Sequence, residues 1–484
     1  MYRTLPGNFL ALHELLIART IPHTVLPSRI LTDVSPDKFP GAWLVVPIGK
    51  YSFHERRALH GLLNRLSGVI MVDPRLQKEF PPGPRILHLK EDLGQSLFRR
   101  YAVKTQKPKR FSRKTVHFGY TFDPDEHGHA APDQEPEQFR LLAEFFASTG
   151  YPLVVAGVSP AVKSWSIGHD TEDQKCLRSG KKIVEFNQSY GVRSTFYLRQ
   201  FMGLGDFTDH HFYKIQKPYT PQEAFRALSR QGTEFGYHGE SATWIALRAG
   251  GLPAVESHGI ALSYLRRELS EEQIQVGSTH MGNHGEVYPQ DFRALAQNRI
   301  TLWRNSFRFN GLTPMRPYLL YDREGNTLSG IWGQMDDVID DLANLTLERP
   351  NHLGHPPQLN QKRLERAIET LKSAPDGHLF FHSHPHNFDD VAGTPKNYAA
   401  VYQALKQAEF SNITSNELVG YWQKRSQVVL QPVAMGSGAR VRVRNSFSGL
   451  VLACYAQAAL EDETGTALRT RILYRTHPTI VQVI

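Results

Sequence analysis

Residues 166–173 read Ser-Ile-Gly-His-Asp-Thr-Glu-Asp, a short apolar strand that ends in acidic side chains. At the carboxyl edge of a parallel sheet, side-chain alternation would bring Asp170 and Glu172 to the same side of the strand. Barrels of alternating strands and helices place their active sites at that edge. The same pattern is also typical of a helix N-terminus with acids in its first turn, so its meaning depends on the rest of the chain.

Three further segments bring histidine to the end of a predicted strand. They are residues 232–240, with His238; residues 277–285, with His280 and His284; and residues 379–386, with His382, His384 and His386. A single histidine in such a place is more often structural than a ligand. Four strand ends that all carry histidine or carboxylate favour a shared site. Because Cys176 and Cys454 are the only cysteines, a metal there would need imidazole and carboxylate ligands.

Strands and helices alternate on both sides of residues 166–173. The predicted strands are 151–155, 194–198 and 378–381, and the predicted helices are 181–190, 221–231 and 361–373. Such alternation predicts an α/β domain built on a parallel sheet, and we expect it to span residues 151–425.

The flanking regions differ from this domain. Residues 1–105 alternate short apolar runs with helix-like stretches, which predicts a small parallel α/β domain. It resembles amidotransferase-like or flavodoxin-like domains, but it lacks a cysteine nucleophile, so we expect a scaffolding role. Residues 106–150 are basic and then rich in turn formers, which is typical of a linker. Residues 426–484 alternate in short strands and predict a small β module.

Composition limits the classes of protein to consider. The chain has 484 residues, of which 40% are hydrophobic and 21% charged, so a largely membrane-embedded or wholly disordered protein is excluded. A net charge of +9 is modest for this length, and we expect no nucleic-acid partner. No secretory signal and no run of about 18 apolar residues is evident, so we expect a cytoplasmic protein without an integral membrane segment. The oligomeric state is not indicated.

The order of motifs resembles the polysaccharide deacetylase family, that is, the NodB homology domain of carbohydrate esterase family 4. Residues 170–172 look like the family's first motif, and residues 190–197 are similar to the strand that follows it. Residues 234–238, Glu-Phe-Gly-Tyr-His, resemble the family's Glu-Ile-Gly-x-His segment. Residues 381–385 resemble its last, histidine-bearing strand, and residues 414–422 its closing helix.

This resemblance implies a distorted (β/α) barrel and a metal-dependent hydrolase that removes an acetyl group from an N-acetylated sugar or polysaccharide, acting on a non-peptide C–N bond. It implies that Asp170 is the general base and that His384 or His382 protonates the leaving amine. A divalent ion, for which zinc is the first expectation, would be held by Glu172, His238, and either His284 or His280.

Two departures from the family pattern keep alternatives open. The family's second histidine, four residues after the first, is replaced by Ala242, and its Arg-Pro-Pro-Tyr motif is missing, so no orienting arginine can be assigned. One alternative is a noncatalytic carbohydrate-binding or assembly protein on the same fold. The other is a hydrolase of small-molecule C–N bonds.

Overall fold

The computed structural model divides into two compact units. Its described residues are 15–23, 43–46, 50–89, 135–199, 219–239, 253–269, 276–280, 289–305, 316–321, 327–335, 357–390, 392–434, 438–475 and 478–484. One unit draws on residues 1–102, 130–160 and 424–484, and the other on residues 103–129 and 161–423. Among the described residues, no helix has the length and apolar character needed to cross a membrane.

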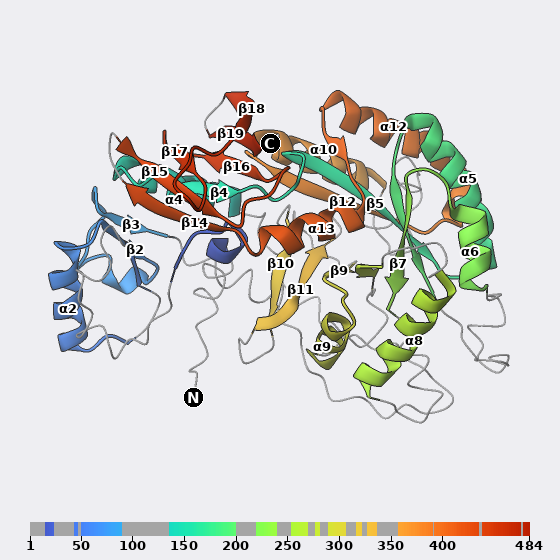
Figure 1. Cartoon of the computed structure of the whole chain (residues 1–484), viewed down its shortest axis with the longest axis horizontal. Helices are drawn as coiled ribbons and strands as arrows, with labels where there is room; N and C mark the ends of the chain where they lie inside the picture. The colour runs from blue at the N-terminus through green and yellow to red at the C-terminus, as the bar shows by residue number, and fades with distance from the viewer. Residues whose placement is uncertain are drawn as a thin grey trace. The chain divides into compact units, whose positions relative to one another are not determined.

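The unit that contains residues 161–423 is built on a parallel sheet (Figure 1). Its parallel strands are β5 (Lys163–Thr171), β6 (Ser194–Leu198), β7 (Thr233–His238), β8 (Ser278–His280), β9 (Leu302–Asn305), β11 (Thr327–Met335) and β12 (Gly377–Ser383). In space they follow the order β11-β9-β8-β7-β6-β5-β12, so most strands lie beside their neighbours in sequence. At the far edge β10 (Tyr318–Tyr321) pairs antiparallel with β11, and the short β13 (Ser411–Asn412) pairs with β5.

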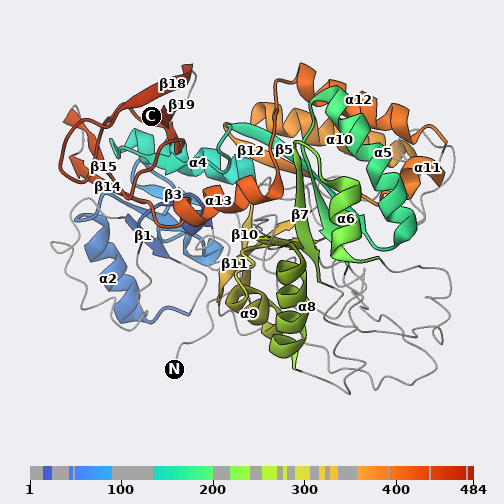
Figure 2. The same cartoon turned by 45° about the vertical axis from the view of Figure 1, so that its right-hand side comes forward.

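Helices connect successive strands of this sheet and lie along its outside (Figures 1 and 2). They are α5 (Gln174–Tyr190), α6 (Pro221–Leu228), α8 (Ala254–Leu269), α9 (Pro289–Gln297), α10 (Pro357–Ser373), α11 (Asn387–Asp390) and α12 (Thr394–Gln407). The last helix, α13 (Ser415–Arg425), follows β13 and connects no two strands of this sheet. The start of α5 is set by Asp173, whose side chain accepts a hydrogen bond from the backbone N–H of Cys176, and its end by Gly191, which has a left-handed φ of 66°. The predicted α/β class is confirmed, as a curled parallel sheet of the distorted (β/α) barrel type.

In the other unit, the N-terminal part forms a small parallel sheet, as predicted. Its strands are β1 (Trp43–Val46), β2 (Gly68–Met71) and β3 (Ile86–His88), with α2 (Phe53–Leu63) and the 3-10 helix η3 (Pro74–Leu76) between them. Val46, Leu59, Val69, Met71 and Phe80 form the buried core of this part. No cysteine occurs in it, so it offers no thiol nucleophile.

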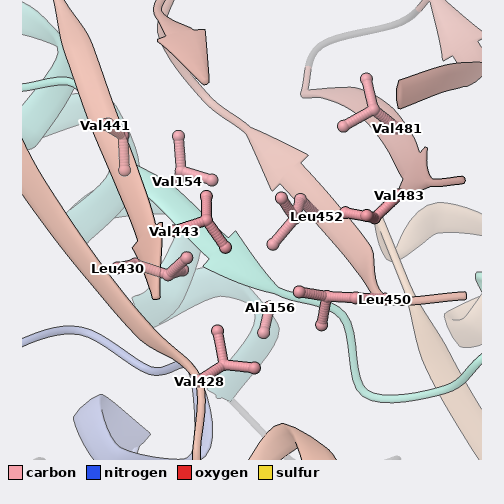
Figure 3. Close-up of a cluster of buried hydrophobic side chains, with 10 residues drawn as sticks. All are labelled: Val154, Ala156, Val428, Leu430, Val441, Val443, Leu450, Leu452, Val481 and Val483. Atoms are coloured by element: carbon pink, nitrogen blue, oxygen red, sulfur yellow. The ribbon is translucent and has the colours of Figure 1, made fainter. Parts of the chain in front are cut away.

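The C-terminal part of the same unit is a β module with two sheets. One sheet contains β14 (Val429–Ala434), β15 (Arg440–Arg444) and β17 (Ala459–Glu461); the other contains β18 (Thr470–Arg475), β19 (Thr479–Val483), β16 (Val451–Cys454) and β4 (Val154–Ala156). Figure 3 shows the valine, leucine and alanine side chains of both sheets meeting in one core. The helix α4 (Glu135–Ser148) precedes β4.

The strand β4 shows a limit of local pattern. The apolar run 151–155 predicts a strand, and β4 (Val154–Ala156) is found there, but it pairs antiparallel with β16 and not with the sheet of β5. A short apolar run predicts a buried strand, but it does not predict the strand with which it pairs.

Candidate active site

The candidate site lies at the carboxyl edge of the parallel sheet, where β5, β7, β9 and β12 end. The backbone of His238 on β7 is level with that of His280 on β8, which in turn is level with Arg304 on β9. On the other side of β5, His382 of β12 lies opposite Gly168. The sheet therefore brings strand ends from distant parts of the sequence to one edge, as the motifs predicted.

Asp170 is the centre of this edge. Its side chain is buried, and its Oδ2 atom lies 2.9 Å from Nε2 of His382 and 4.0 Å from Nε2 of His238. Its other oxygen, Oδ1, accepts a hydrogen bond of 3.3 Å from Nη1 of Arg304. The structure thus joins three residues that the sequence singled out, and adds an arginine that it did not.

Arg304 is a buried cation beside Asp170 that no sequence motif indicated. Its side chain is fully buried, and its guanidinium lies over the rings of Tyr197 and Phe380, 4.8 and 5.3 Å from their centroids. A Cβ atom at Gly168 would lie only 2.4 Å from Nη1 of Arg304, so a side chain at this position would displace the guanidinium. Gly168 inside an apolar strand was the one local signal that another group approaches the backbone closely there.

Glu172 follows β5 and has its own arginine. Its Oε1 atom accepts a hydrogen bond of 2.9 Å from Nη2 of Arg199, whose side chain is only 3% exposed, and lies 4.0 Å from Nε2 of His238. Burial alone would raise the pKa of Glu172, but Arg199, followed by His384 and His238, lowers it to about 2. Glu172 is therefore an ionised carboxylate at neutral pH.

A row of histidines runs outward from Asp170 along the end of β12. The ring centroids of His382 and His384 are 4.8 Å apart, and those of His384 and His386 are 5.6 Å apart. Nδ1 of His386 lies 3.5 Å from Sγ of Cys176. Burial, with the nearby carboxylates of Glu172 and Asp173, raises the pKa of this thiol, so Cys176 is protonated at neutral pH and is a poor nucleophile.

The described residues include one group with the geometry of a metal site. Single ligand atoms of Asp170, His382 and His384 all lie within 4.8 Å of one another. One carboxylate and two imidazoles are a donor set that suits zinc and similar divalent ions and leaves a position for water or substrate. The chain thus offers residues that fit a divalent ion, whose identity the donor set does not decide.

The ligand set predicted from the sequence is described only in part. Glu172 and His238 are close to each other, as above. The backbone of His280 ends β8 at the level of His238, but its side chain lies outside the described residues, as do His284 and Ala242. The predicted roles of Asp170, His382, His384, Glu172 and His238 stay predictions.

Comparison with known proteins gives a likeness in fold. No family model matches the sequence, and no curated protein matches it. A putative polysaccharide deacetylase from Mycobacterium smegmatis superposes with a TM-score of 0.37 and 12% identity, covering 56% of this chain and 95% of that one. The likeness to polysaccharide deacetylases is one of fold.

Two further solved structures are similar to this chain. Peptidoglycan deacetylase PdaC from Bacillus subtilis gives a TM-score of 0.29 at 12% identity, covering 55% of this chain and 95% of that one. A CE4 family pseudoenzyme from Bacillus anthracis gives a TM-score of 0.29 at 13% identity, covering 54% of this chain and 66% of that one.

Proposed function

We propose that the protein is a metal-dependent hydrolase that removes an acetyl group from an N-acetylated sugar or polysaccharide. One observation carries this proposal: the buried carboxylate of Asp170 stands between His382 and Arg304 at the carboxyl edge of a parallel sheet. Burying a carboxylate is costly unless charged partners surround it, and such arrangements gather at catalytic sites. The sugar class comes from the motif order in the sequence.

The side chains of the site divide the chemistry between them. When bound, a divalent ion polarises the acyl oxygen and lowers the pKa of water towards 7. In the division that the family resemblance implies, Asp170 takes the proton of the attacking water, and Arg304 orients its carboxylate through a hydrogen bond to Oδ1. His384 or His382 gives a proton to the leaving amine, while Glu172, His238 and a histidine of 280–284 hold the ion.

A second assignment of roles to these residues is also consistent with their spacing. Asp170, His382 and His384 together hold the ion, as their spacing allows. Both divisions require a divalent ion at the same buried edge of the sheet. The proposed function therefore does not depend on which of the two is correct.

One observation favours a noncatalytic carbohydrate-binding protein as the second candidate. Arg199 already neutralises Glu172, which is one of the predicted ligands. Together with Ala242 in place of the family's second histidine, this pairing would suit a site that binds a sugar without hydrolysing it.

The experiment that tests the proposal measures acetate release and bound metal on the full chain. N-acetylglucosamine oligomers and N-acetylated small molecules are incubated with the chelator-treated protein, with and without added zinc. Zinc-dependent acetate release supports the proposal, and the preferred substrate separates a sugar deacetylase from a small-molecule hydrolase. Saturable sugar binding with neither stoichiometric metal nor acetate release would support the noncatalytic candidate instead.

A further inference from the structure

The two carboxylates at the site use their oxygens differently. In Asp170 one oxygen contacts the arginine and the other contacts the imidazole: Oδ1 accepts a hydrogen bond from Arg304, and Oδ2 lies 2.9 Å from Nε2 of His382. In Glu172 the same oxygen makes both contacts: Oε1 accepts a hydrogen bond of 2.9 Å from Arg199 and lies 4.0 Å from Nε2 of His238. An arginine is present in each case, so the arginines do not distinguish the two acids. What distinguishes them is that the imidazole-facing oxygen of Asp170 is not the one that bonds its arginine.

Arg199 is fixed in place beside Glu172 by the end of β5. Its backbone N–H donates to Oη of Tyr219 at 2.9 Å and to the carbonyl oxygen of Thr171 at 3.2 Å. Tyr219 in turn donates from its hydroxyl to the same carbonyl of Thr171. This network fixes the backbone of Arg199, and its guanidinium donates to Oε1 of Glu172 at 2.9 Å. A cation at that oxygen would have to displace the guanidinium against electrostatic repulsion.

The imidazoles that face Asp170 come from the adjacent strand. β12 pairs in parallel with β5, with His382 opposite Gly168, two residues before Asp170. His382 lies in β12, and His384 directly follows the end of that strand. Their ring centroids are 4.8 Å apart, and their ligand atoms lie within 4.8 Å of an oxygen of Asp170. His238 is 4.0 Å from both carboxylates and so does not separate them.

We infer that Asp170, His382 and His384 hold a divalent ion, while Glu172 stays bound to Arg199 and is not a ligand. This inference rests on the proposed function only in requiring that the site takes a divalent ion. It places the ion between β5 and β12 and not between β5, β7 and β8. One carboxylate oxygen and two imidazole nitrogens suit Zn²⁺, with Co²⁺ as a spectroscopic substitute.

The test measures zinc affinity of the chelator-treated full chain by calorimetric titration with Zn²⁺ alone, independently of any activity. We expect His384→Ala to weaken zinc binding by at least about 100-fold, since loss of outer partners alone costs 10–100-fold at such sites. His386→Ala, the next histidine in the same row, is the matched control and is expected to change affinity by less than about threefold. Asp170→Asn and Glu172→Gln form a second pair, and only the first is expected to lose zinc.

Each outcome decides the matter. Loss of zinc in Glu172→Gln overturns the inference, whether or not His384→Ala also loses it, and so does full retention in His384→Ala. A wild-type chain that takes up no divalent ion overturns the proposed function together with the inference. If Asp170→Asn does not fold, which its circular dichroism would reveal, the half-buried His384 still gives the answer. The visible spectrum of the Co²⁺-loaded protein provides a second readout, which His384→Ala should change and His386→Ala should not.

Discussion

Strands β5 and β12 bury a histidine near each end of their pairing, and the two surroundings differ in charge. At the amino edge, His378 places Nδ1 2.7 Å from Oγ of Ser164 and Nε2 2.8 Å from Oγ of Ser166. At the carboxyl edge, His382 of the same strand faces the carboxylate of Asp170, which itself faces Arg304. At the amino edge the imidazole of His378 lies between neutral hydroxyl groups, whereas at the carboxyl edge the imidazole of His382 lies beside charged side chains.

This contrast separates a structural histidine from a chemical one. Burial lowers the pKa of His378 to about 3, so its ring is neutral and both of its nitrogens have partners. Burying the charged groups at the carboxyl edge costs desolvation free energy, which apolar side chains at the same positions would not cost. A buried histidine therefore indicates a functional site when its partners are charged and it lies at the carboxyl edge of the sheet.

The largest expected effect is at the carboxyl edge, on activity. Asp170→Asn should lower deacetylation turnover by about 10²-fold or more, because a positioned base contributes typically 10²–10⁴-fold and loss of a metal ligand would cost at least as much. Steady-state acetate release measures the effect. Ser164→Ala, at the amino edge of the same strand, should stay within about threefold of wild type, and an equal loss in both variants would contradict the contrast.

The next effect is on stability. Arg304→Met leaves the buried carboxylate of Asp170 without its guanidinium partner and should lower the free energy of unfolding by about 3–5 kcal/mol. Urea unfolding measures the change. Lys182→Met, which removes a more exposed pair with Asp389, is the control and should cost less than about 1 kcal/mol. Similar costs for the two variants would show that the Asp170–Arg304 pair is not desolvated.

A pH prediction concerns the amino edge. The pKa of His378 is about 3 when folded, against an ordinary 6.5, so the unfolded chain binds the additional proton between these values. Stability must therefore fall as the pH drops through this window, by about 2 kcal/mol between pH 7 and pH 5 for one such group. Comparing urea unfolding of wild type and His378→Asn at both pH values isolates this contribution. An unchanged pH dependence in the variant would mean that the pKa of His378 is the same in the folded and unfolded chain.

The smallest effect should come from one hydroxyl. Ser166→Ala removes the partner of Nε2 of His378 but leaves Ser164 in place, so we expect a loss of about 1 kcal/mol in unfolding free energy. Thermal and urea unfolding both measure it, and zinc affinity should not change. A change in zinc affinity would show that the two edges are coupled through the strand.

Much of the sheet could be predicted because its strands are locally apolar and alternate with helices. The runs at 194–198 and 378–381 and the helices at 221–231 and 361–373 all overlap observed elements. The strand-end rule also brought Asp170, His238 and His382 together correctly, since the carboxyl ends of neighbouring parallel strands share an edge.

Arg304 and Arg199 could not be predicted in the same way. Each pairs with an acid in or directly after another strand, and an arginine within or directly after a short apolar strand has no local feature that identifies its partner. The neighbour of β4 was hidden for the same reason, because its register is set by β16 in a distant part of the chain. Local pattern specifies an element, whereas pairing across long separations is a property of the assembled fold.

The pairing of β4 with β16 has a consequence for the order of folding during synthesis. Strands β5 to β12 all lie between these partners in sequence, so their sheet can form while β4 still waits for its neighbour. At translation rates of about 5–20 residues per second, the ribosome needs roughly 15 to 60 seconds to go from β4 to β16. During that interval Val154 and Ala156, which are buried in the finished core, have no partner sheet to cover them. The nascent chain therefore exposes an apolar segment for a time set by the translation rate, and slower translation prolongs its exposure to aggregation and to chaperones.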